Sequence, residues 1–374
     1  MADEVLQADF RGSGAAELAD AGIELFSTCP QSAGAESAEY LERVGDVARW
    51  SDDAGHVGML VYTDNGLVDP WLLAQLVLEG TESLCPLVAV QPIYMHPYSA
   101  AKMVASLAFL HNRRIFINMV AGGFRNDLLS LDDDTPHDER YDRLVEYTQI
   151  IKGLLSSTEA LSFDGVYYRL KNVKMTPPLP PELFPGITVS GSSEAGLAAA
   201  RAIGATAVKY PRPPHEENGH LVDDSIRLGM RAGVIARETT EEAWAVAYAR
   251  FPACRKGQLT HKLAMKISDS NWHRHLSELA EHAEQHETPY WLGPFENYKT
   301  FCPYLVGSYD TVSAELARYM RRGFKTFILD IPCSREELAH IELAFRIAVR
   351  TTAAGVPAED FQRDPKRASA GGRA

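Results

Sequence analysis

Eight short apolar segments, separated by stretches of helical spacing, constrain the fold of this chain more than any other feature. Strands that are apolar throughout and alternate with helices are typical of parallel sheets covered on both faces. Eight such units predict an α/β protein built as a closed (β/α)8 barrel, with an open doubly wound sheet as the alternative. In chain order, the predicted strands are Ile23–Thr28, His56–Thr63, Ser83–Gln91, Arg113–Val120, Gly186–Ser190, Ala205–Tyr210, Gly229–Ala236 and Thr326–Ile331.

The segments between these strands carry helix signals. Apolar residues recur at spacings of three and four from Glu36 to Ala54, and Asp69-Pro70 offers an N-cap followed by a proline at the first helical position. A hairpin is predicted at Leu161–Leu170, with Asp164-Gly165 as its turn. Further helices are predicted at Asp69–Glu79, Pro97–Leu110, Asp138–Leu155, Ser193–Ile203, Thr240–Arg250 and Arg335–Arg350.

Residues 1–353 are interpreted as one domain. Residues 251–305 lie between the seventh helix and the eighth strand and are too many for a simple loop. We therefore expect a helical insertion there, with a mobile segment that acts as a lid over the site. Residues 354–374 have the polar composition of a disordered tail.

Charge and cysteine content exclude several classes of protein. The net charge is −13, from 37 Lys+Arg against 50 Asp+Glu, which argues against nucleic acid or an anionic membrane as partner. The acidic N-terminus lacks a signal-peptide pattern, and no apolar run approaches the ~18 residues of a membrane span, so a cytoplasmic protein is expected. No CxxC pair occurs, which favours reduced thiols over disulfides or a metal site; the five cysteines are Cys29, Cys85, Cys254, Cys302 and Cys333.

In a barrel of this kind the active site lies at the carboxyl ends of the strands. Tyr62, Asp64 and Asp330 lie at the carboxyl ends of predicted strands and are candidates for substrate contact or proton transfer. His96 follows the third strand, where it either lines the cavity or lies in a loop. Asn118 ends the fourth strand, and a core-facing asparagine needs a neighbour or a ligand to satisfy its amide.

A glycine-serine turn between the fifth strand and its helix predicts an anion site. Gly191, Ser192 and Ser193 place free backbone N–H groups and two hydroxyls at a helix N-terminus, which suits a phosphate. The alternative is that Ser193 only caps the helix. No GxGxxG fingerprint follows a strand and no Walker A motif is present, so a mononucleotide phosphate is favoured.

Charged residues elsewhere leave alternatives open. Arg231 lies in the middle of an apolar strand, so it pairs either with an anion of substrate or cofactor or with an internal carboxylate. The segment His137–Tyr141 (HDERY) can be an ordinary helix start with acidic residues favoured by the helix dipole. The histidines of the insertion lack metal-ligand spacing and are expected to face solvent; they are His273, His275, His282 and His286.

Taken together, the segments resemble bacterial luciferase-like flavin-dependent monooxygenases, in particular the alkanesulfonate monooxygenase branch. The HDERY and SGSSEAG segments at their observed separation carry much of the resemblance, which spans about residues 23–350. The similar stretches run in family order and are Gly58–Leu73, Leu107–Gly122, His137–Ile150, Phe163–Tyr168, Ser190–Ala200, Leu228–Ala243 and Leu305–Asp330.

The resemblance implies a TIM barrel that forms a homodimer through the early helices, or a homotetramer. It also implies reduced FMN (FMNH2) supplied by a separate NAD(P)H:flavin reductase, with O2 and a small molecule as substrates. Gly191, Ser192 and Ser193 would then hold the FMN phosphate, with Tyr141 nearby. The resemblance places Asn118 and Ala121 along the flavin and His137 and Arg140 in support of the pocket.

The chain departs from the alkanesulfonate branch around the substrate. Arg231 matches an active-site arginine of that branch, but Gly233 stands where the branch has histidine and Leu67 where it has cysteine. After the eighth strand, Asp330-Ile-Pro-Cys333 replaces a Tyr-Pro-His segment. We therefore expect a specialised metabolite or a carrier-bound intermediate as substrate rather than a simple alkanesulfonate.

The mechanism implied by the resemblance passes through a flavin C4a-(hydro)peroxide that the protein shields from water. Arg231 would hold an anionic group of the substrate or stabilise the peroxide anion. Two alternatives remain at this stage. One is a deazaflavin (F420)-dependent dehydrogenase of the same superfamily, and the other is a non-catalytic flavin-binding protein.

Overall fold

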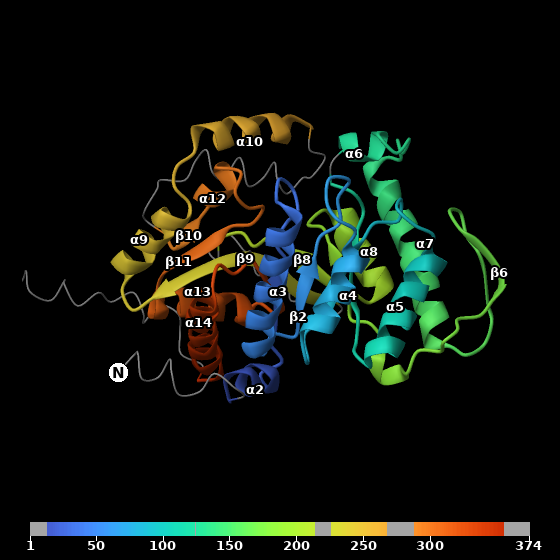
Figure 1. The fold of residues 1–374 in the computed structure, drawn as a ribbon, viewed down its shortest axis with the longest axis horizontal. Helices are drawn as coiled ribbons and strands as arrows, with labels where there is room; N and C mark the ends of the chain where they lie inside the picture. The colour runs from blue at the N-terminus through green and yellow to red at the C-terminus, as the bar shows by residue number, and fades with distance from the viewer. Residues whose placement is uncertain (1–12, 124, 214–225, 268–287, 355–374) are drawn as a thin grey trace, which may run out of the picture.

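Eight parallel strands close into a barrel (Figure 1). The computed structural model describes residues 13–123, 125–213, 226–267 and 288–354. The predicted (β/α)8 TIM barrel is confirmed, and each predicted strand overlaps an observed one. Around the barrel, the strands are β1 (Glu24–Thr28), β2 (Gly58–Val61), β3 (Cys85–Val90), β4 (Phe116–Val120), β7 (Ile187–Ser190), β8 (Thr206–Lys209), β9 (Arg227–Arg237) and β12 (Phe324–Leu329).

Helices surround these strands. Asp69 caps α4 as predicted, since its carboxylate accepts the N–H of Trp71 at 2.9 Å. An N-terminal helix, α2 (Ser13–Asp20), was not predicted and packs against the last helix. The other surrounding helices are α3 (Ser37–Asp53), α4 (Pro70–Gly80), α5 (Pro97–His111), α7 (His137–Ser156), α8 (Glu194–Ile203), α9 (Thr240–Arg250), α13 (Tyr309–Arg321) and α14 (Arg335–Ala353). No helix in the described ranges is long and apolar enough to cross a membrane.

The predicted insertion contributes more than helix. α10 (Arg255–Ile267) and α12 (Gly293–Glu296) are helical, but β11 (Tyr304–Ser308) pairs in parallel with the carboxyl half of β9 and is joined by the short β10 (Tyr290–Trp291). The predicted insertion therefore contains strand in addition to helix, because the apolar run before α13 pairs with β9. The four histidines predicted to face solvent and the predicted tail lie outside the described residues, so neither prediction is tested.

Two connections also differ in detail from the prediction. The hairpin of β5 (Leu161–Asp164) and β6 (Arg169–Val173) turns through four residues rather than two, because Asp164 pairs with Arg169. The carboxylate of Glu146 holds this turn by accepting the N–H groups of Val166 and Tyr167. The loop after β4 contains a short helix, α6 (Arg125–Leu129), and a 3-10 turn, η1 (Pro181–Leu183), precedes β7.

A layer of apolar side chains fills the barrel below the carboxyl ends of its strands. Phe26 and Phe116 meet edge to face across the interior, with ring centroids 5.2 Å apart. Leu60, Val208 and Ile328 belong to the same cluster and form the floor of the cavity above it. The barrel is thus a packed core with its usable space at one end.

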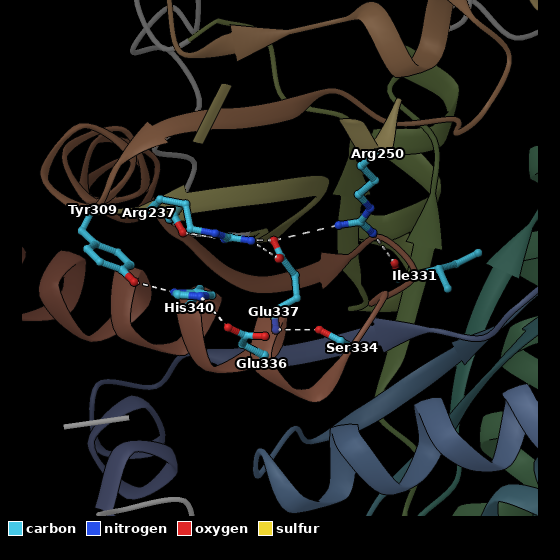
Figure 2. A network of polar contacts seen from close by, with 9 residues as sticks. Arg237, Arg250, Tyr309, Ile331, Ser334, Glu336, Glu337 and His340 are labelled. Carbon is cyan, nitrogen blue, oxygen red and sulfur yellow. Dashed lines mark hydrogen bonds and ion pairs between the residues drawn. The ribbon is translucent and has the colours of Figure 1, made fainter. Parts of the chain in front are cut away.

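A buried charge network ties β9 to α14 (Figure 2). The carboxylate of Glu337, in the first turn of α14, accepts a hydrogen bond from Arg237 Nη2 at 2.5 Å and lies 4.0 Å from Arg250 Nη1. Arg250 also donates to the backbone carbonyl of Ile331 at 2.7 Å. This fixes the segment that follows β12, where Asp330 lies.

Candidate active site

A cavity of about 440 Å³ opens at the carboxyl ends of the barrel strands. The structure brings most of the predicted site residues together in its wall and leaves His96, Arg140 and Asp330 outside the lining. The predicted residues in the wall are Tyr62, Asp64, Asn118, Ala121, His137, Tyr141, Gly191, Ser192, Ser193 and Arg231. Four strands or the segments that follow them contribute these residues, namely β2, β4, β7 and β9, so only the closed barrel brings them together.

The turn after β7 has the form of an anion cradle. Ser193 caps α8 by accepting the N–H of Gly196 at 3.1 Å, and it hydrogen-bonds with the hydroxyl of Tyr141. A Cβ atom on Gly191 would lie 2.4 Å from that hydroxyl, so the turn requires glycine. The Ser192 hydroxyl has no hydrogen-bond partner among the described residues. The interpretation of Ser193 as the helix cap is therefore confirmed, and the hydroxyl of Ser192 is available to a ligand.

Asn118 lies beside this cradle with half of its amide already used. Its Oδ1 accepts the hydroxyls of Thr188 at 2.7 Å and Ser190 at 2.9 Å. No acceptor for its Nδ2 group exists within the described part of the chain. A buried amide with free donors on a cavity wall is suited to an acceptor on a bound molecule.

Arg231 carries a buried cation on the wall contributed by β9. Its guanidinium lies over the ring of Tyr62, 4.8 Å from the centroid, and Nη1 is 3.4 Å from the Tyr210 hydroxyl. The Asp330 carboxylate lies 3.9 Å from Nη2, which is beyond hydrogen-bonding distance. Nε and Nη2 are buried without hydrogen-bond partners. The group therefore has an internal countercharge and still has donors for an anion.

Asp330 supports Arg231 from outside the cavity. Its second carboxylate oxygen accepts the hydroxyl of Tyr304 at 2.7 Å. Burial, reinforced by the Asp330 carboxylate, raises the pKa of Tyr304 well above its ordinary value, so this hydroxyl stays protonated and donates. Asp330 thus contacts Arg231 and has no direct access to the cavity.

The remaining predicted residues have mixed placements. His96 is exposed and caps α5, with Nδ1 accepting the N–H of Tyr98 at 3.1 Å. Arg140 is buried under the start of α7 and donates to the carbonyl of Thr135. His137 does line the cavity, with its ring edge-on to Tyr141. The loop alternative for His96 is the one that the structure supports.

The mouth of the cavity holds residues that the sequence did not single out. Asp127 from α6 and Tyr298 and Phe301 from the predicted insertion line it. Asp127 was within reach of sequence reasoning, because it follows the fourth strand and that loop must lie at this end of the barrel. Tyr298 and Phe301 follow no strand of the barrel, so no strand-end rule finds them.

Gly233 explains one departure from the alkanesulfonate pattern. A Cβ atom there would lie 2.2 Å from Cζ of Tyr304. The Tyr304 ring therefore occupies the space that a histidine at 233 would need. The hydroxyl of Tyr304 donates to Asp330.

Comparison with known proteins agrees with this geometry. Residues 23–326 match the luciferase-like monooxygenase family. Over 308 residues the chain is 37% identical to the 4-(gamma-L-glutamylamino)butanoyl-[BtrI acyl-carrier protein] monooxygenase BtrO of Niallia circulans, covering 81% of this chain and 90% of that protein.

Solved structures share the fold at lower identity. DmoA from Hyphomicrobium sulfonivorans superposes with a TM-score of 0.67 at 16% identity, covering 89% of this chain and 88% of that one. An F420-dependent secondary alcohol dehydrogenase superposes with a TM-score of 0.59 at 15% identity, covering 87% of this chain and 99% of that one. These likenesses support the barrel and do not bear on the substrate.

Proposed function

The chain belongs to the luciferase-like monooxygenase family and is a flavin-dependent monooxygenase. On that premise, we propose that it uses reduced FMN from a separate reductase to insert one atom of O2 into a small organic substrate. The observation that carries this proposal is the pairing, in one cavity, of a phosphate-sized cradle with a buried arginine that retains free donors. The first suits the cofactor and the second suits an anionic group of the substrate.

The residues of the cradle fit an FMN phosphate. Gly191 leaves room that a Cβ atom would fill, and the Ser192 hydroxyl and the start of α8 face the same space. Asn118 supplies amide donors for the polar edge of a flavin, and Ala121 offers a small apolar surface beside it. When bound, reduced flavin supplies the activation of O2.

The chain's own residues supply binding and the exclusion of water. Arg231, fixed between the rings of Tyr62 and Tyr210, binds the anionic group and orients the substrate. The apolar floor of Leu60, Val208 and Ile328 keeps bulk water from the reacting atoms. Asp64 is the ionisable group on the wall nearest in sequence to Tyr62, and we propose it for proton transfer or substrate contact.

A simple alkanesulfonate is a poor candidate for the substrate. The space for a second cationic side chain at position 233 is taken by Tyr304, and Leu67 lines the cavity in place of a thiol. The curated relative acts on an acyl chain borne by a carrier protein. We propose a specialised metabolite of comparable kind, free or carrier-bound, for this chain.

Anaerobic titration followed by mixing with O2 tests the proposal. The chain is titrated with reduced FMN, oxidised FMN and reduced F420, and each complex is then mixed rapidly with oxygenated buffer. Preference for reduced FMN and a transient oxygen-dependent absorbance are expected. Binding of the deazaflavin alone would support the dehydrogenase alternative. Binding of FMN followed by reoxidation without a transient absorbance would support the alternative of a non-catalytic flavin-binding protein.

A matched variant pair links the result to the cradle. Ser192→Ala is expected to weaken FMN binding roughly tenfold, because one hydroxyl donor to a charged phosphate is lost. Ser156→Ala removes an exposed hydroxyl at the end of α7 that does not line the cavity, and it is expected to leave FMN binding unchanged. Equal effects of the two variants would place the phosphate elsewhere.

A further inference from the structure

The cavity wall carries two carboxylates, Asp64 and Asp127, as well as the cation Arg231; the function proposed above gives Asp127 no role and leaves that of Asp64 open between proton transfer and substrate contact. We propose that the substrate also carries a cationic nitrogen, received by Asp64 and Asp127 on the cavity wall that Tyr94 and Tyr298 also line, while Arg231 binds the anionic group. The substrate class is then a molecule with an amine at one position and an acid at another. This inference rests on the proposed function for its anionic half.

The chain builds the acidic group by joining two loops. Asn65 donates from Nδ2 to the backbone carbonyl of Asp127 and to the hydroxyl of Ser130, both at 3.0 Å. Tyr94 donates its hydroxyl to Asn65 Oδ1 at 2.6 Å. The loop after β2 and the helix α6 are thereby held together, and Asp64 and Asp127 come to line the same stretch of wall.

The two carboxylates have no countercharge in the described part of the chain. Neither forms an ion pair there, and the one hydrogen bond to either side chain is from the N–H of Gly66 to Asp64 Oδ1, at 2.8 Å. Burial and then the charge of Asp64 raise the pKa of Asp127. A cation between the two carboxylates would relieve this repulsion.

Two aromatic rings complete the subsite. Tyr94 and Tyr298 line the same cavity as the two carboxylates, and the charges of Asp64 and Asp127 add to burial in raising the pKa of both phenols. Carboxylates flanked by aromatic rings suit an ammonium group, which gains from the negative ring faces as well as from the charges.

The acidic group is separate from the Arg231 group. Arg231 forms its ion pair with Asp330 and none with Asp64 or Asp127. Its buried Nε and Nη2 still lack hydrogen-bond partners although two carboxylates line the same cavity. One small ion cannot satisfy both groups, whereas one molecule with two opposite charges can.

Binding of amino acids of graded length to the flavin-free chain tests this inference. The probes are 4-aminobutanoate, 6-aminohexanoate and 8-aminooctanoate, each compared by calorimetry with the unsubstituted acid of equal length. The best amino acid is expected to bind about tenfold more tightly than its matching acid, because a charged hydrogen bond is added. If no amino acid binds more tightly than its matching acid, the inference is wrong.

Variants assign the preference to particular side chains. Asp64→Asn and Asp127→Asn are each expected to remove the preference for the amino acid while leaving the affinity for the plain acid unchanged. Arg231→Gln is expected to weaken the binding of the amino acid and of the plain acid to the same extent. Asp20→Asn, which removes an equal charge from an exposed position outside the cavity lining, is the control and should change neither. Equal weakening of both ligands in the aspartate variants would contradict the assignment.

These outcomes separate this inference from the proposed function. Flavin titration reports on the cradle, whereas the amino acid series needs no flavin. If the chain prefers amino acids but binds no flavin, the site for two opposite charges is supported and the proposed use of reduced FMN is wrong. If the chain binds reduced FMN but shows no preference, the reverse holds.

Discussion

Single atoms decide whether the cradle after β7 can form. The Tyr141 hydroxyl lies only 2.4 Å from the position that a Cβ atom at residue 191 would take, and the same hydroxyl hydrogen-bonds with Ser193. A larger residue at 191 must therefore displace the tyrosine and the serine together. The glycine and the tyrosine act as one unit, although fifty positions separate them in the chain.

Gly191→Ala is expected to weaken binding of reduced FMN roughly 10- to 100-fold, since overpacking of this size costs about 1–3 kcal/mol. Fluorescence titration under anaerobic conditions measures the effect. In the double variant Gly191→Ala with Tyr141→Phe, the obstructing oxygen is absent and part of the affinity should return. Native affinity in Gly191→Ala alone would show that the phosphate does not use this turn.

Sequence reasoning reached these residues to different extents. Ser193 and Arg231 are recognisable because a cap before a helix and a cation within an apolar strand are local patterns. The position of Tyr141 against Gly191, and of Tyr304 above Gly233, depends on contacts between distant segments that no local pattern encodes. His96 is a different case, because sequence left it open between cavity and loop, and its side chain caps α5 outside the cavity lining.

Among the elements, β9 and α14 depend on each other through buried charge. Glu337→Gln is expected to destabilise the fold by about 3–5 kcal/mol, because Arg237 then lacks its closest carboxylate and Arg250 loses a neighbouring charge. Thermal or urea unfolding measures this loss. Glu336→Gln is the matched control on the same helix, where 81% of the side chain is exposed, and its effect should be within about 0.5 kcal/mol. Similar effects for the two variants would contradict a structural role for the network.

His56, a buried histidine just before β2, is expected to make the free energy of unfolding depend on pH. Burial lowers the pKa of His56 from 6.5 to about 4, and its Nδ1 has no hydrogen-bond partner. Between these two pKa values the unfolded chain binds a proton that the folded chain does not. The contribution of His56 is therefore present above pH 6.5 and is lost as the pH falls toward 4.

Unfolding by urea at a series of pH values measures the size of this effect, which is expected to be roughly 3 kcal/mol. His56→Gln removes the titrating group and should flatten the profile in this window, whatever its effect on absolute stability. An unchanged slope in that variant would assign the acid sensitivity to another group.

Elements with their own periodicity were predictable, and elements held by long-range pairing were not. Short apolar runs in the sequence predict the eight barrel strands. β11 has a similar run, but its place beside β9 follows from register, which the sequence pattern does not contain. α6 is only five residues long and polar, so its helix depends on the loop that Asn65 ties down.

Across the whole molecule, the outer faces of α4 and α5 are the largest feature left unexplained by the barrel. α4 buries Trp71 and Leu73 on its inner side but leaves Leu72 64% exposed, so a large apolar side chain lies on its outer face. On α5, Phe109 is 69% exposed, and the neighbouring Leu110 is exposed as well. These two helices lie side by side in Figure 1.

A second copy of the chain covering this surface would bury it, and a homodimer is therefore expected. Leu72→Glu combined with Phe109→Glu should convert the dimer to a monomer in sedimentation velocity, since each variant places a charge in the interface. Val166→Glu also adds a charge at an exposed apolar position, on the hairpin away from α4, and should leave the dimer intact. A native chain that sediments as a monomer at micromolar concentration would contradict the prediction. A dimer that survives the double change would instead place the interface on another face.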